Sequence, residues 1–130
     1  TFSEPVRELI ERRITEVAQA TAQSHGSRAE LDYSRLFPPT VSTEREAAFA
    51  AQVAAKLVGA ERVITKPMPS TASEDFSCML EARPGAYLRV GQGGAEQGRT
   101  LHNPNYDFND EILPLGAALL ASLAVDALPL

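Results

Sequence analysis

Two consecutive prolines, Pro38 and Pro39, constrain this chain more than any other feature of its sequence. They lie in the stretch FPPTVS at residues 37–42. Each proline fixes its own φ angle, lacks a backbone N–H, and disfavours a helical residue before it. A helix therefore cannot continue through this point, and the chain must take an extended path. We expect a hinge or a domain crossing here, with one set of elements before it and another after it.

Before the prolines, the sequence predicts one helix and one strand. Ser3, followed by Glu4 and Pro5, is typical of a helix start. Apolar residues then recur at three- and four-residue steps until Gly26, which suits the left-handed position after a helix end. The stretch AELDYSRLF at residues 29–37 alternates apolar and polar residues, as a half-exposed strand does. One helix and one strand cannot close a core of their own.

After the prolines, helical and extended segments alternate. The predicted elements are, in order, a helix at 43–59, a strand at RVITK (62–66), a short helix through Met79 and Leu80, a strand at AYLRVG (86–91) and a closing helix from about residue 111 to about residue 128. A glycine-rich connection and a loop that contains a histidine separate the last two. This order predicts an α/β fold in which helices pack on the faces of a sheet.

Composition excludes several classes of partner. The net charge is −5 and the pI is about 5.0, so no basic patch is available to bind a nucleic-acid backbone. The sequence has no apolar run of about 18 residues, so we expect no membrane partner.

Cys78 is the single cysteine, which rules out an internal disulfide and favours a reducing, cytoplasmic location. The start TFSEPVREL has no signal-peptide pattern and no methionine, which suggests a piece of a longer chain.

His102 is the main candidate for chemistry. It lies in TLHNPNYDFND at residues 100–110, among turn-forming residues. A neutral imidazole on a proline-stiffened loop is a good zinc or manganese ligand, and Asp107 or Asp110 could hold its second nitrogen in the required tautomer. The alternative is a loop histidine that is hydrogen-bonded within its own turn. From spacing alone this alternative is the commoner one, because a single ligand does not make a metal site.

A second candidate is the start of the short helix, SEDF at residues 73–76. Acidic residues in a first helical turn are the expected response to the helix dipole, and this is the simpler explanation. The functional alternative is that Ser73 and Glu74 form one wall of a pocket, where Glu74 or backbone N–H groups contact a polar substrate. The glycine-rich stretch VGQGGAEQG lacks the phosphate-binding pattern GxxxxGK[ST], so we do not interpret it as a phosphate site.

The ordered set of motifs is more informative than any one of them. TFSEPVRELIERRI, AELDYSRLFPPTV, SEDFSCML, AYLRVG and LHNPNYDFND are followed by an alanine- and leucine-rich helix. In this order they resemble the carboxy-terminal part of metal-dependent amidohydrolases. The group comprises hippurate hydrolases, N-acyl-amino-acid hydrolases and auxin-conjugate hydrolases, within the aminoacylase/carboxypeptidase superfamily. The similarity covers essentially the whole chain.

The resemblance implies a two-domain enzyme. An α/β/α layered catalytic domain holds two divalent metals, and a smaller α+β lid domain often makes the dimer contact. By this resemblance, residues 1–38 are the last helix and strand of the lid, and residues 39–130 are the carboxy-terminal part of the catalytic domain. His102 matches the last metal ligand of the family. Ser73 and Glu74 match a loop beside the substrate pocket, where the family more usually has a glycine or two before the glutamate.

The family's other metal ligands are absent from this sequence. They come from an amino-terminal H-x-C-G-H-D-like motif, an adjacent Glu-Glu pair that includes the general base, and a further histidine before the lid. A catalytic divalent site needs about three protein ligands and an open position for water. We therefore expect this segment alone to be inactive and to hold no metal tightly, and we assign no catalytic residue within it.

The full-length parent is expected to hydrolyse the amide bond of N-acyl or N-aroyl amino acids, with Zn, Mn, Co or Ni as its metal. Expected partners are the missing amino-terminal part of the same protein and a further copy of the chain. Both would cover apolar faces that otherwise stay exposed, at Val6, Leu9 and Ile10 and at Leu119, Leu120 and Leu123. The alternative is a stand-alone small α/β binding or interaction module without catalysis, in which His102 is a turn residue.

Overall fold

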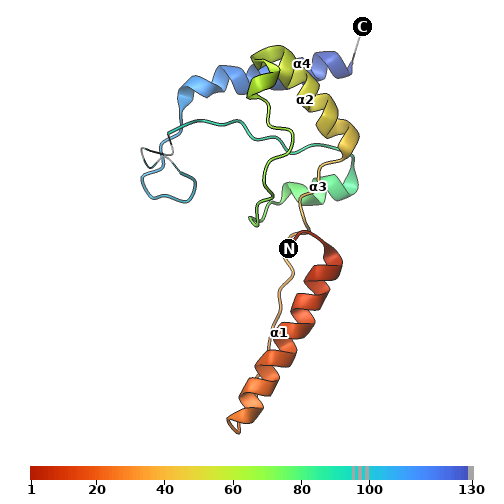
Figure 1. The fold of residues 1–130 in the computed structure, drawn as a ribbon, viewed down its shortest axis with the longest axis vertical. Helices are drawn as coiled ribbons and strands as arrows, with labels where there is room; N and C mark the ends of the chain where they lie inside the picture. The colour runs from red at the N-terminus through yellow and green to blue at the C-terminus, as the bar shows by residue number, and fades with distance from the viewer. Residues whose placement is uncertain (95, 97, 99, 129–130) are drawn as a thin grey trace. The chain divides into compact units, whose positions relative to one another are not determined.

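The structure is a computed structural model, and it describes residues 1–94, 96, 98 and 100–128 (Figure 1). Its elements are, in chain order, α1 (Glu4–Ser24), α2 (Glu44–Val58), the 3-10 helix η1 (Ala60–Arg62), α3 (Phe76–Ala82), the 3-10 helix η3 (Asp110–Ile112) and α4 (Leu113–Ala127). The chain divides into two compact units. The first contains residues 1–43 and 68–85, and the second contains the described residues of 44–67 and 86–130.

The four predicted helices are confirmed, because each is encoded by local signals. α1 begins after Ser3, which has an extended backbone and accepts a hydrogen bond from the Arg7 N–H through its carbonyl (3.1 Å). Pro5 lies in the first turn, where its missing N–H costs nothing. α1 ends before Gly26, whose φ of 65° is the left-handed conformation that glycine adopts freely.

Residues 27–42 do not form the strand that their alternating pattern predicts at 29–37. They run as an extended segment beside α1 (Figure 1), joined to it by side chains. The Arg35 guanidinium donates to Glu11 (Nε to Oε2, 2.7 Å) and to Glu4 (Nη1 to Oε1, 2.9 Å), and Arg7 donates to the Phe37 carbonyl. The prediction failed because a strand needs a second strand to complete its hydrogen bonds, and the neighbour here is a helix with its backbone groups already paired.

The carboxylates of α1 hold this extended segment electrostatically. The hydrogen bond to Glu11, and then the negative charges of Glu11, Glu4 and Glu8, raise the pKa of the Arg35 guanidinium above its ordinary value. Arg35 is solvent-exposed, and exposed ion pairs contribute little to the free energy of unfolding. The pairing therefore joins the segment to α1 but adds little to stability.

In the first unit, the segment before α2 is also joined to the segment after α3. Thr43 donates from its backbone N–H to the Gly85 carbonyl (2.9 Å), and its hydroxyl bonds the same carbonyl (3.0 Å). The Gly85 N–H in turn donates to the Thr43 hydroxyl (3.0 Å). We call these three hydrogen bonds the Thr43–Gly85 clasp. They fix residues that lie 42 positions apart in the sequence.

The second unit is built on the packing of α2 against α4. Ala50 and Val53 of α2 are 4% and 2% exposed, and they are the buried apolar side chains among the described residues. Lys56 and Asp126 form an ion pair between the two helices (2.7 Å). Pro114 lies in the first turn of α4, where proline is tolerated.

The predicted α/β fold class is wrong for the part of the chain that the structure describes. Residues 62–66 and 86–91 are not strands, and the described residues contain no sheet. Sheet hydrogen bonds run between strands, so an isolated extended segment cannot satisfy its own backbone groups. None of the three predicted strands pairs with another. The division into a lid at 1–38 and a catalytic part at 39–130 stays a prediction.

Over the described residues, no helix has both the length and the apolar character needed to cross a bilayer.

Candidate functional site

His102 lies in a tight turn of the second unit and has an unusual backbone conformation. Its φ is 64°, and it is the non-glycine residue with a positive φ among those described. This left-handed region costs most L-residues about 1–2 kcal/mol, although His, Asn and Asp occur there more often than others. The side chain is exposed, and no hydrogen bond or ion pair joins it to another described residue. The turn therefore presents the imidazole outward.

Asn103 shapes the turn through both its backbone and its side chain. Its N–H donates to the Thr100 carbonyl (3.3 Å), and its carbonyl accepts from the Tyr106 N–H (2.9 Å). The side-chain oxygen accepts from the Asn105 N–H (2.8 Å), as in an Asx turn, and the side-chain amide donates to the Gly98 carbonyl (3.0 Å). The sequence contained this signal, because asparagines in a proline-containing stretch are typical of such turns.

Gln92 joins the far end of the loop to an earlier segment. Its Oε1 accepts from the Tyr106 hydroxyl (3.2 Å) and from the Asn109 N–H (3.2 Å). Its backbone carbonyl accepts from the Asn109 side-chain amide (3.0 Å). Asn109 also caps η3, because its Oδ1 accepts from the Glu111 N–H (3.1 Å). Sequence reasoning did not find Gln92, because nothing in a glycine-rich stretch indicates which loop it contacts.

The two aspartates proposed to orient His102 lie on the same loop. Asp107 is exposed in an irregular part of the loop, and Asp110 is the first residue of η3. Neither is hydrogen-bonded to the His102 ring within the described residues. Their orienting role stays a prediction.

Ser73 and Glu74 belong to the first unit, whereas His102 belongs to the second. Ser73 is exposed, and Glu74 is half-buried just before α3. The Glu74 carboxylate accepts from the Phe76 N–H (3.4 Å), and its backbone carbonyl accepts from the fully buried Ser77 hydroxyl (2.6 Å). Glu74 therefore supports the start of α3, and its contact with substrate stays a prediction.

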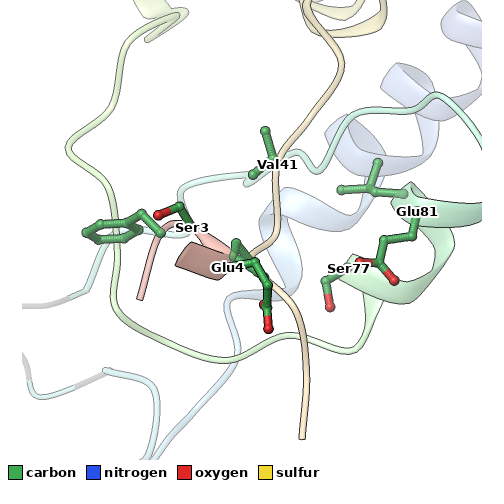
Figure 2. A pocket seen from close by; sticks show the side chains of 8 residues that line it. Ser3, Glu4, Val41, Ser77 and Glu81 are labelled. Carbon is green, nitrogen blue, oxygen red and sulfur yellow. The ribbon is translucent and has the colours of Figure 1, made fainter. Parts of the chain in front are cut away.

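A pocket of about 360 Å³ also lies in the first unit (Figure 2). Its lining residues come from the start of α1, the proline segment and α3: Phe2, Ser3, Glu4, Pro39, Val41, Ser77, Leu80 and Glu81. The Glu4 carboxylate in its wall is already paired with Arg7 and Arg35. None of the predicted site residues lines this pocket.

The donor set of the described residues fits one metal ligand and not a complete site. No group of three or more His, Cys, Asp or Glu residues within the described part of the chain is placed to hold a metal ion. A catalytic divalent site needs about three protein ligands. His102, exposed and without a described protein partner, is suited to supply one of them.

Comparison with known proteins gives a consistent result. The sequence profile of Peptidase family M20/M25/M40 matches residues 3–126. An IAA-amino acid hydrolase ILR1-like 5 from Arabidopsis thaliana is 32% identical over 90% of the chain, and a hippurate hydrolase from Campylobacter jejuni is 30% identical over 92%. An N-acetylcysteine deacetylase from Bacillus subtilis is 29% identical over 96%.

The chain spans only 28%, 30% and 31% of the lengths of these three relatives. No solved structure matches it significantly.

Proposed function

Because this chain belongs to Peptidase family M20/M25/M40, we propose that it is the carboxy-terminal segment of a metal-dependent amidohydrolase that cleaves N-acyl or N-aroyl amino acids. Two kinds of evidence support the proposal. The family profile covers nearly the whole chain, and relatives are named as hydrolases of IAA-amino acids and hippurate and as a deacetylase of N-acetylcysteine.

The observation that carries the proposal is the presentation of His102. A left-handed residue that costs about 1–2 kcal/mol persists only when its surroundings hold it there, and such residues are often found at functional sites. Here the hydrogen bonds of Asn103 hold the turn, and the imidazole is exposed and is not hydrogen-bonded to another described residue. A histidine that served only to close its turn would be bonded to it.

We assign His102 as one ligand of a divalent metal, either Zn, Mn, Co or Ni. When bound, such a metal polarises the amide carbonyl and lowers the pKa of water. Asp107 or Asp110 accepts the hydrogen bond from the second imidazole nitrogen and thereby sets the tautomer that binds metal through the first. Ser73 and Glu74 contact the acyl or carboxylate group of the substrate.

The remaining ligands and the general base belong to the rest of a longer polypeptide. One imidazole cannot replace about three ligands, so the 130-residue chain alone neither binds metal tightly nor hydrolyses amides. A stand-alone binding module is disfavoured, because the described residues bury only Ala50 and Val53 as apolar side chains. A reducing compartment such as the cytoplasm suits its single cysteine, Cys78.

The test compares two histidine variants of the full-length protein. His102→Ala should lower the bound metal and reduce hydrolysis of N-acetylcysteine, hippurate and an IAA-amino acid by more than about 100-fold, because losing even a residue that supports a ligand costs about 10–100-fold. His25→Ala is the matched control, since His25 is exposed at the end of α1. Unchanged metal content and activity in His102→Ala would refute the assignment.

A further inference from the structure

We infer that Gln92 is the positioning residue for His102: it fixes the end of the metal-ligand loop against an earlier segment of the chain. This inference rests on the proposed function of His102 as a metal ligand. Gln92 was not indicated by any sequence motif. In this inference Asn103 sets the shape of the turn, and Gln92 sets the position of the loop.

The contacts of Gln92 converge on the carboxyl side of the loop. Its Oε1 accepts two hydrogen bonds at 3.2 Å, from the Tyr106 hydroxyl and the Asn109 N–H, across 14 and 17 residues of sequence. An amide oxygen has two lone pairs, so these two bonds fill its capacity as an acceptor. The bond from the Asn109 side chain to the Gln92 carbonyl adds a third link at the same place (3.0 Å).

Asn103 cannot perform this task. Its hydrogen bonds reach Gly98, Thr100, Asn105 and Tyr106, all within five residues of it. They define the local turn, but they do not fix the orientation of the turn relative to α4. Gln92 supplies that orientation, because Asn109 both contacts Gln92 and caps η3, which continues directly into α4.

Placement matters because a metal ligand must be held within about 0.5 Å of its productive position. A loop released at Tyr106 and Asn109 would leave the strained His102 turn supported only by local contacts. The imidazole would then sample several positions, and each metal-binding event would have to select one of them. Loss of such a supporting residue typically lowers metal affinity by about 10–100-fold.

The experiment measures Zn²⁺ affinity by chelator competition, and the visible absorption spectrum with Co²⁺ bound, in the full-length protein. Gln92→Ala should weaken Zn²⁺ binding by about 10–100-fold and alter the Co²⁺ spectrum. Gln52→Ala, an exposed glutamine of α2, is the matched control and should change neither. A purely structural role would lower the melting temperature of the metal-free protein but leave Zn²⁺ affinity and the Co²⁺ spectrum unchanged, and that result would overturn the inference.

A second variant keeps the test decisive if Gln92→Ala fails to fold. Tyr106→Phe removes one of the two bonds to Gln92 Oε1 and retains the ring, so it should weaken Zn²⁺ binding by a smaller factor. His102→Ala in the same assay separates the two claims. If His102→Ala binds Zn²⁺ normally, the proposed function fails; if it loses Zn²⁺ while Gln92→Ala or Tyr106→Phe binds normally, only the positioning inference fails.

Discussion

At the scale of single residues, the left-handed backbone of His102 and the side chains around it form the most specific feature of the chain. Many residue types can occupy a helical position, but His102 is exposed and has a φ of 64°, which most L-residues adopt only at a cost in free energy. Asn103 holds the turn through hydrogen bonds rather than through burial, and Gln92 bonds the far end of the same loop at Tyr106 and Asn109. Substitutions here should therefore separate backbone preference from ligand chemistry.

Replacing His102 by glycine tests the backbone part of this account. His102→Gly should be more stable than His102→Ala by about 1 kcal/mol in metal-free full-length protein, because glycine adopts a positive φ without the Cβ clash. Both variants lack the imidazole, so both should lose the metal ligand equally. Urea unfolding measures the difference, and an alanine variant as stable as the glycine variant would mean that position 102 is not left-handed.

The Thr43–Gly85 clasp gives a second prediction at this scale. Thr43→Val keeps the shape of the side chain but removes its two hydrogen bonds to Gly85, each worth about 1 kcal/mol. The free energy of unfolding should fall by about 1–2 kcal/mol. Thr43→Ser retains the hydroxyl and should stay close to wild type in the same denaturation experiment. Equal losses in both variants would show that the methyl group, not the hydroxyl, matters.

At the scale of elements, the helices could be predicted and the strands could not, for one physical reason. The start of α1 at Ser3 and Pro5 and its end before Gly26 are encoded within a few residues. The strand predicted at 29–37 depended on a partner strand that its own sequence cannot specify. Gln92 was missed for the same reason, since its contacts lie 14 and 17 residues away, whereas the role of the asparagine-rich turn is local.

The packing of α2 on α4 predicts a large effect from a small change. Val53 is 2% exposed, so Val53→Ala removes two buried methyl groups and leaves a cavity. The free energy of unfolding should fall by about 1–3 kcal/mol. Gln52→Ala, at the exposed position next to it, should cost less than about 0.5 kcal/mol. If Val53→Ala behaves like its control in thermal unfolding followed by circular dichroism, the two helices do not pack in solution.

At the scale of the whole molecule, the chain leaves much apolar surface uncovered. α4 carries Leu120 and Val125 at 69% and 70% exposure, although a helix this apolar is normally buried. On α1, Val6, Leu9, Ile14 and Val17 are also exposed. Both faces are explained if the rest of a longer polypeptide, or a second copy, normally covers them.

Uncovered apolar faces predict how the isolated 130-residue chain behaves. It should bind a hydrophobic dye such as ANS and should elute from size-exclusion chromatography larger than a monomer. Leu120→Lys and Val125→Glu together, at exposed positions of α4, should reduce both effects without loss of helix content. If the isolated chain elutes as a monomer and binds no dye, the idea that another polypeptide segment normally covers these apolar faces would be contradicted.

The central claim is that the 130-residue chain supplies one metal ligand, His102, but does not contain a complete metal site. It is tested most directly by titrating Zn²⁺ into the isolated chain and into the full-length protein. Calorimetry at equal protein concentrations should show stoichiometric binding to the full-length protein and none to the isolated chain. Stoichiometric, His102-dependent binding by the isolated chain would show that the site is complete within residues 1–130, and it would contradict this account.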